Sequence, residues 1–377
     1  MKRRKLISAM FLLSIFIVST INIRAETELE HKPEDIEELS IIKIEDHDSY
    51  DKIIVDKNSD DADYKSIQKA VDGASDGSTI YVKEGSYSEI IHIDKKINLI
   101  GENKENTLIN PESKKNSYAV KITAAGVKLS GFSISNDGPG LYTTGVKITA
   151  SQTTIEDCNV FDTPVGIAVW SSNNIISNCT FWGCEDEGIV FLGSSTSECN
   201  NNLVTNCEFY NNCDGIELQY SSNNVISYCE FYDNTHAGID AIGSSNNNNV
   251  ISNCDLYDNE VFGIYLSRSS ENQITQCMIS NNQIMMSSSK NNTIDNCELE
   301  SIYLRDTTLN IENCENLEES KIKTVNSVYE IYNKENVHAA TISEKIENAK
   351  ENYYSKFSSI FALLNLIRSR ISNYLGM

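Results

Sequence analysis

Residues 221–240 read SSNNVISYCEFYDNTHAGID, and residues 252–270 return to the same order as SNCDLYDNEVFGIYLSRSS. In each segment a cysteine precedes an acidic residue, an apolar residue and a tyrosine, and the chain then reaches Gly-Ile. The Cys-x-apolar alternation is typical of a short β-strand, and Gly-Ile-x-apolar of another. Ser/Asn clusters predict turns, because their short side chains bond to their own backbone and tolerate left-handed conformations. Both segments are therefore copies of one strand-and-turn unit.

This unit recurs along most of the chain at a similar period. Eight cysteines, which we call the cysteine ladder, follow one another at intervals of 17 to 28 residues: Cys158, Cys179, Cys207, Cys229, Cys254, Cys277, Cys297 and Cys314. Short strands at a period near 22 residues predict the coils of a parallel β-helix, an all-β solenoid. Leucine-rich repeats share this period, but their Leu/Asn signature is missing from the sequence.

We expect the ladder cysteines to point inward, where each stacks on the cysteine of the next coil. Neighbouring coils lie about 4.8 Å apart, a separation that suits the Cα atoms of a disulfide. Side chains that point in parallel would have to twist out of register to bond, so we expect reduced, buried thiols. Cys184 and Cys213 lie outside the ladder in equivalent turns of adjacent coils. A disulfide between these two remains an open alternative.

The N-terminal region is typical of an exported protein. Lys2, Arg3, Arg4 and Lys5 precede an apolar run from Leu6 to Ile23, which predicts a signal peptide over residues 1–25, either cleaved or retained as an anchor. Residues 26–62 are predicted to be an acidic linker with a lead-in strand, and residues 63–330 the β-helix repeats. We expect the protein outside the cell, on the cell surface or in the periplasm.

Helices are predicted at both ends of the repeats. Ile67, Ala70, Val71 and Ala74 have the spacing of an amphipathic helix, which we expect to cap the open N-terminal end of the solenoid. Residues 331–377 are predicted to be a helical, amphipathic tail, with an apolar stripe formed by Phe357, Ile360, Phe361, Leu364, Ile367, Ile371 and Leu375. This tail either caps the solenoid or contacts a partner or a membrane surface.

The charge of the chain excludes one class of partner. The formal net charge is −23, and loss of residues 1–25, which carry five basic and no acidic residues, would lower it to −28. Nucleic-acid binding needs clustered Lys and Arg, so we expect no nucleic-acid partner. An anionic polysaccharide is also disfavoured unless a cation bridges the two surfaces.

Outward positions of the repeats supply the candidate ligand-binding residues. Large aromatic residues recur at one position and acidic residues two positions earlier: Trp182, Tyr210, Tyr232 and Tyr257, with Glu208, Glu230 and Asp255. We expect each aromatic ring to offer a sugar its flat apolar face and the carboxylates to accept the hydroxyl hydrogens of the sugar. The predicted partner is a polysaccharide or cell-wall glycan. The alternative is an aromatic ladder that only stabilises the sheet.

Catalytic candidates lie on the Gly-Ile strand. Glu217 and Asp240 are predicted to stack in adjacent coils, with Glu187, Asp214 and His236 beside them. Crowded carboxyls acquire separated pKa values, as acid/base pairs require. A glycoside hydrolase would use Glu217 and Asp240, whereas a lyase or epimerase would use His236 or Tyr265 as its base. The alternative is a group of solvated charges. We expect no specific metal site and no certain cofactor, although these carboxylates could accept Ca²⁺.

Two stretches resemble known families. YKSIQKAVDGASDGSTIYVKEGSYSEIIHI (64–93) resembles the opening of pectin-lyase-like, right-handed β-helix proteins, including pectin methylesterases. The Asn-rich coils resemble the repeats of the NosD-type periplasmic copper-binding family and of exported carbohydrate-binding and sugar-hydrolase domains. The resemblance implies a right-handed parallel β-helix. The Gln-Asp and Gly-Arg-Pro-Trp motifs of the methylesterases do not occur in the sequence, so esterase activity is not expected.

The sequence favours an exported, non-catalytic envelope protein that binds carbohydrate or serves a structural or adhesive role. The alternative is a polysaccharide-active enzyme, either a lyase, an epimerase or a glycoside hydrolase. A NosD-like protein that handles metal ions is a further alternative. It is weaker because the ladder cysteines are predicted to be buried, out of reach of an ion, and because the chain has only five histidines.

Overall fold

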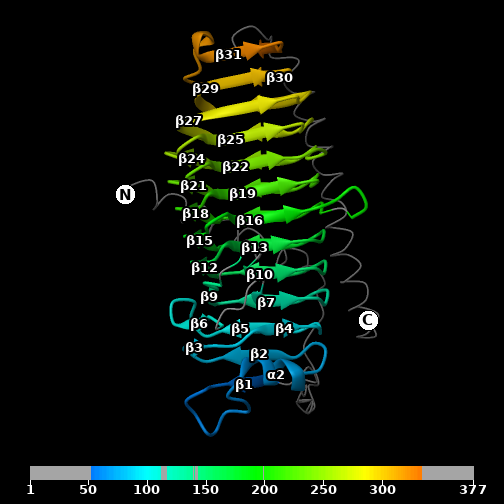
Figure 1. Cartoon of the computed structure of the whole chain (residues 1–377), viewed down its shortest axis with the longest axis vertical. Coiled ribbons are helices and arrows are strands. Elements are labelled where there is room, and N and C mark those ends of the chain that lie inside the picture. Colours follow the sequence, from blue (N-terminus) through cyan, green and yellow to red (C-terminus); the bar gives the residue numbers. More distant parts are fainter. Residues whose placement is uncertain (1–51, 112–116, 139, 141–142, 198, 333–377) are drawn as a thin grey trace, which may run out of the picture. The chain divides into compact units, whose positions relative to one another are not determined.

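A computed structural model describes residues 52–111, 117–138, 140, 143–197 and 199–332 (Figure 1). These residues form stacked coils of parallel strands, which confirms the predicted all-β parallel solenoid. One sheet has 13 strands: β1 (Lys52–Val55), β2 (Thr79–Val82), β5 (Asn98–Gly101), β8 (Lys128–Ser130), β11 (Thr154–Glu156), β14 (Ile175–Ser177), β17 (Leu203–Thr205), β20 (Val225–Ser227), β23 (Val250–Ser252), β26 (Gln273–Thr275), β28 (Asn292–Asp295), β30 (Thr308–Glu312) and β32 (Val328–Tyr332).

The second sheet joins two rows of strands. The first row contains β3 (Gly85–Tyr87), β6 (Thr107–Ile109), β9 (Ser133–Ser135), β12 (Asn159–Phe161), β15 (Thr180–Trp182), β18 (Glu208–Tyr210), β21 (Glu230–Tyr232) and β24 (Asp255–Tyr257). The second row contains β4 (Ile91–Ile93), β7 (Tyr118–Ile122), β10 (Thr144–Ile148), β13 (Val165–Val169), β16 (Glu187–Leu192), β19 (Asp214–Gln219), β22 (Ala237–Ile242), β25 (Phe262–Ser267), β29 (Glu298–Arg305) and β31 (Ile322–Val325). The long strand β27 (Met278–Ser287) pairs with both β24 and β25 and so connects the rows.

The asparagines explain how the chain turns from one strand to the next. In the coil that leads from β17 to β20, Asn206, Asn211 and Asn223 have φ values of 54°, 55° and 58°. This left-handed conformation is costly for most residues, and Asn tolerates it because its short side chain forms local hydrogen bonds.

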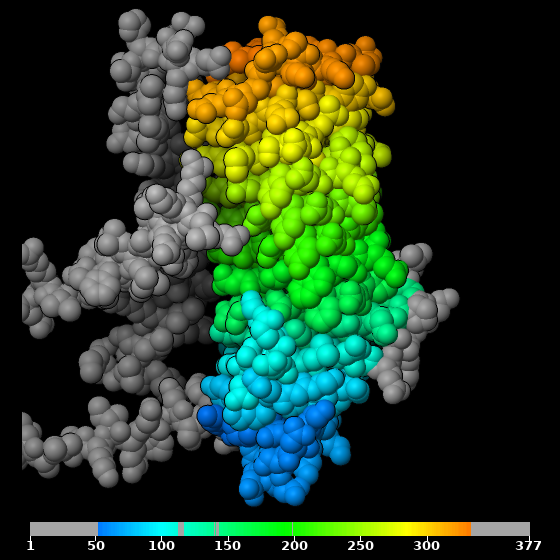
Figure 2. Space-filling view, turned by 90° about the vertical axis from the view of Figure 1, so that its left-hand side faces the viewer, coloured from blue at the N-terminus to red at the C-terminus, as the bar shows by residue number. Residues whose placement is uncertain are grey.

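Successive coils appear as bands of colour in Figure 2, each displaced along the axis from the one before.

At several of these corners the next residue is an asparagine whose side-chain amide points into the interior. Two buried ladders of asparagines run between coils: Asn174, Asn202, Asn224, Asn249, Asn272 and Asn292 in one, and Asn212, Asn234, Asn259 and Asn282 in the other. In the first ladder, Asn224 Oδ1 accepts from the backbone N–H and the side-chain amide of Asn202. The Asn-Asn pairs of the sequence therefore combine a corner with an internal hydrogen bond.

The ladder cysteines fill the interior beside these turns. All of them are buried except Cys314, which is partly exposed. Burial raises the pKa of the thiols of Cys158, Cys179 and Cys207 far above its ordinary value. All eleven cysteines are free, and no bond joins Cys184 to Cys213. The predicted inward, reduced ladder agrees with this arrangement.

Close approach between coils explains the glycine that precedes each isoleucine. A Cβ added at Gly215 would lie 2.5 Å from the backbone oxygen of Gly238 and 2.6 Å from the Phe231 ring. These distances leave no room for a side chain. Phe209 and Phe231 stack directly beside this position, with ring centroids 4.8 Å apart, so the glycines allow large rings to fill the core.

A short helix and a short 3-10 turn complete the described elements. Helix α2 (Ile67–Gly73) buries Ile67, Ala70 and Val71 and contacts β1, β2 and β4, while the 3-10 turn η2 spans Glu319–Lys321. The role of helix α2 as an end cap stays a prediction. The proposed signal peptide (1–25) and the predicted helical tail beyond Tyr332 lie outside the described residues. In the part of the chain that is described, no helix has the length and apolar character needed to cross a bilayer.

Candidate functional site

Two outward surfaces carry the predicted site residues. The first, which we call the aromatic–acidic surface, lies on β15, β18, β21 and β24 and consists of Trp182, Tyr210, Tyr232, Tyr257, Glu208, Glu230 and Asp255. In β18 and β21 the middle residue is buried and its two neighbours are partly exposed. The register pairs Trp182 with Tyr210, Tyr210 with Tyr232, and Tyr232 with Tyr257. The structure therefore brings the predicted rows together in successive coils.

The rings of this surface stack on one another. Centroids of successive rings, from Phe161 through Trp182, Tyr210 and Tyr232 to Tyr257, are 4.6, 5.9, 5.1 and 5.2 Å apart, and their planes are within 9° of parallel. Each inner ring thus covers the faces of its neighbours. The surface presents ring edges and hydroxyls to solvent, which differs from the expectation that each ring offers its flat face to a sugar.

The acidic row holds two of the tyrosine hydroxyls. Tyr232 Oη donates to Glu208 Oε1 at 2.8 Å, and Tyr257 Oη donates to Glu230 Oε1 at 2.6 Å. Burial, followed by these carboxylates, raises the pKa of both tyrosines, so the hydroxyls stay protonated. Each bond crosses from one coil to the preceding one. The sequence could not show this pairing, because partners are separated by 24 and 27 residues.

The second surface, which we call the carboxylate cluster, consists of Glu187, Asp214, Glu217, His236 and Asp240. Glu187 pairs in register with Asp214, and Glu217 with Asp240. The predicted stacking of Glu217 on Asp240 in adjacent coils is therefore present. Asp214 follows Tyr210 by only four residues, so the cluster begins directly past the corner that ends the aromatic–acidic surface. All four carboxylates are buried and His236 is partly exposed.

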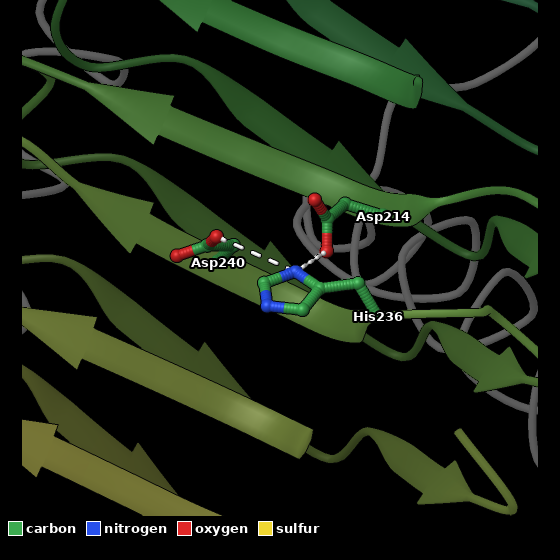
Figure 3. A group of neighbouring side chains, drawn as sticks. All are labelled: Asp214, His236 and Asp240. Atoms are coloured by element: carbon green, nitrogen blue, oxygen red, sulfur yellow. Dashed lines mark hydrogen bonds and ion pairs between the residues drawn. The ribbon is translucent and has the colours of Figure 1, made fainter. Parts of the chain in front are cut away.

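His236 lies between two of these carboxylates (Figure 3). Its Nδ1 is 2.8 Å from Asp214 Oδ1, which comes from the preceding coil, and 3.7 Å from Asp240 Oδ2 on β22, the strand that begins directly after His236. The other ring nitrogen points away from both carboxylates. Asp214 thus fixes the orientation of the imidazole, as a carboxylate does for a general base. Glu217 Oε1 accepts a hydrogen bond from Gln219 Nε2.

Burial dominates the electrostatics of the cluster. It raises the pKa of Glu187 to about 9 and that of Asp240 to about 8, and neighbouring carboxyls add to both shifts. The pKa values of Asp214 and Glu217 are also raised, again chiefly by burial. Protonated carboxyls beside an oriented imidazole can donate, accept and relay protons, so the arrangement suits acid/base chemistry as well as ligand binding.

Sequence reasoning named these residues, but it could not identify Asp214 as the partner of His236. Asp214 lies 22 residues earlier, and only the register between coils brings it to the imidazole. Tyr265, the next residue in the same outward row as Asp240, is paired with it in register. The alternation of inward and outward positions on the Gly-Ile strand was the signal that located this row.

Comparisons with known proteins agree with the fold. The family described as "Right handed beta helix region" matches residues 96–249, 192–267 and 240–355. The A-module of the mannuronan C-5 epimerase AlgE4 from Azotobacter vinelandii is 15% identical, covers 71% of this chain and 90% of its own, and has a TM-score of 0.53. An alginate lyase from Paenibacillus sp. is 13% identical, with coverages of 71% and 94% and a TM-score of 0.43. The Dettilon tailspike protein is 15% identical, with coverages of 75% and 68% and a TM-score of 0.45. No curated protein sequence matched the chain.

Proposed function

Because the chain belongs to the right-handed β-helix family, we propose that it is an exported protein that binds a polysaccharide along the outward side of its coils, without catalysis. The basic head at Lys2–Lys5 and the apolar run after it support export. The mannuronan C-5 epimerase with a similar fold acts, by its name, on a polysaccharide, and this is the class of polymer that we propose.

The repeated aromatic–acidic surface carries this proposal. Its side chains recur in register at the strand spacing of about 4.8 Å, so a polymer lying along the axis meets the same groups in each coil. Ring edges supply apolar contact, and the carboxylates of Glu208, Glu230 and Asp255 accept hydrogen bonds from sugar hydroxyls. A neutral polymer suits this surface best because the chain is strongly acidic.

The test is a glycan array followed by titration of the polymers that bind. Replacing both Tyr210 and Tyr232 by Ala should weaken binding about ten-fold or more, since the loss of two edge contacts and of Tyr hydrogen bonding corresponds to about 1.4 kcal/mol or more. The matched control replaces Tyr220 and Tyr228 by Ala and should leave binding unchanged. These two tyrosines are 40% and 62% exposed and lie outside the aromatic–acidic surface. Equal binding by the Tyr210/Tyr232 variant and the parent would mean that the aromatic ladder is only structural.

A polysaccharide-active enzyme is the second candidate, favoured by the hydrogen bond between His236 Nδ1 and Asp214 Oδ1 and by the register of Glu217 with Asp240. Retaining glycosidases need carboxyl groups about 5–5.5 Å apart, which is close to the spacing of adjacent coils, about 4.8 Å. A lyase or epimerase would use His236 as a base. Polymers that bind should be analysed for shortened or epimerised products. Glu217→Gln or Asp240→Asn should abolish any turnover while leaving binding at the aromatic–acidic surface unchanged, and binding without product would exclude this candidate.

A further inference from the structure

We propose that Asp214, His236 and Asp240 form a binding site for one divalent transition-metal ion of the Zn²⁺ or Mn²⁺ class. This inference goes beyond glycan binding, and it departs from the sequence-based expectation of no specific metal site.

The ligand atoms already lie within reach of a single ion. Each of the three residues offers one atom, and these atoms all lie within 4.8 Å of one another. Zn²⁺ binds imidazole nitrogen and carboxylate oxygen at about 2.0–2.2 Å, so two ligands on opposite sides of an ion are separated by little more than 4 Å. Small rotations of the side chains of Asp214 and Asp240 would therefore place both oxygens and Nδ1 around one centre (Figure 3).

Backbone and ring contacts hold the imidazole in this position. The backbone N–H of His236 donates to Cys213 O at 2.9 Å, and its carbonyl accepts from the N–H of Phe262 at 2.9 Å. The Phe262 ring packs edge-on against the imidazole, with centroids 5.7 Å apart and planes at 83°. A site on rigid strands with a fixed imidazole loses little conformational entropy when an ion binds.

A buried oxygen without a partner is the second, independent observation. Asp240 is 3% exposed, and its Oδ1 has no hydrogen bond. A buried carboxylate oxygen without a partner is costly, and such groups are normally paired or bound to a metal. Among the described residues, no lysine or arginine forms an ion pair with Asp214 or Asp240. The other oxygen, Oδ2, is the one that faces His236 Nδ1, so a rotation of the Asp240 carboxyl would bring Oδ1 onto the ion and supply its missing partner.

The set of donors selects the class of metal. One imidazole nitrogen with two carboxylate oxygens suits borderline ions such as Zn²⁺ and Mn²⁺, whereas Ca²⁺ prefers six to eight oxygen ligands. The side chain of His236 is 35% exposed, so water can reach the ion and complete its coordination. The ladder thiols, which would attract softer ions, are buried in the core, apart from Cys314, which is partly exposed.

Calorimetric titration of chelator-stripped full-length protein with ZnCl₂, MnCl₂ and CaCl₂ tests the proposal. We expect about one Zn²⁺ per chain, with weaker binding of Mn²⁺, since affinity increases from Mn²⁺ to Zn²⁺. His236→Gln and Asp240→Asn should each weaken Zn²⁺ binding by about 100-fold or more, because loss of a supporting residue alone costs about 10–100-fold. The controls His92→Gln and Asp233→Asn remove a histidine and an acidic residue elsewhere and should bind as the parent does.

Three outcomes would overturn the assignment. They are Zn²⁺ uptake that is unchanged in folded His236→Gln or Asp240→Asn protein, Ca²⁺ binding as tight as Zn²⁺ binding, and a thiolate charge-transfer band in the cobalt-loaded parent protein, which would place the ion on the cysteines. The cobalt spectrum is measured on the parent, so it decides the question even if both variants fail to fold. Circular dichroism shows whether each variant keeps its β-structure.

Discussion

Replacing Asn224 by Ala should show how much one internal amide stabilises a coil. Asn224 Oδ1 accepts from the backbone N–H of Asn202 at 2.8 Å and from its side-chain amide at 3.1 Å. Its own amide donates to Cys199 O and to Asn249 Oδ1. Asn224 is 1% exposed, so water cannot take over these roles. It is also outside the left-handed region, so alanine brings no backbone strain.

The substitution leaves two buried donors of Asn202 without an acceptor. Each costs about 1–3 kcal/mol, so we expect the free energy of unfolding to fall by about 2–5 kcal/mol. Asn174 is the matched control, because its Oδ1 accepts only from the backbone N–H of Thr153 in the preceding coil. Asn174→Ala should therefore cost about half as much.

Urea denaturation followed by circular dichroism measures both variants. The slopes of the transitions must be compared as well, because solenoids can unfold in parts. If Asn224→Ala costs no more than Asn174→Ala, the number of orphaned donors does not set the stability, and the reasoning fails.

Three further outcomes are expected. Alkylation of native protein should leave most ladder cysteines unmodified, and denaturation without reductant should expose them; denatured protein with almost no free thiol would contradict the reduced ladder. Deleting residues 341–377 should preserve the β-rich circular dichroism but promote self-association, since Val328 and Tyr332 of the last described strand are 65% and 50% exposed; a truncated protein that stays monomeric at high concentration would exclude a capping role. Burial raises the pKa of Glu187 from 4.5 to about 9, so its contribution to stability is complete below pH 4.5 and is lost as the pH rises towards 9. Glu187→Gln should flatten this decline in chelator-treated protein, and an unchanged pH profile of the unfolding free energy would refute the burial argument.

The repeat could be predicted because its signals are local. The position of Cys229 two residues before Phe231, and the Asn-Asn pair at 223–224, each report on one strand or one corner. These signals gave the period, the inward cysteines and the turns. The outward rows followed from alternation along each strand.

Contacts between coils could not be predicted with the same detail. The interval from Cys179 to Cys207 is 28 residues, longer than its neighbours, and the extra chain includes a turn closed by hydrogen bonds between Ser194 and Ser197. The strands on either side keep their register despite this insertion. Spacing in the sequence therefore does not reveal which atoms meet, such as His236 Nδ1 and Asp214 Oδ1, or that successive rings cover each other.

The register between coils also limits how this protein can change over evolutionary time. Each strand bonds to the equivalent strand one coil away, so a duplication or deletion is tolerated best when it adds or removes one whole coil. Such an event lengthens or shortens the outer rows by a step of about 4.8 Å. The length of polymer that the proposed binding surface would follow thus changes in steps of one coil. Related chains should differ in length by whole coils, with the insertions between them confined to the corners.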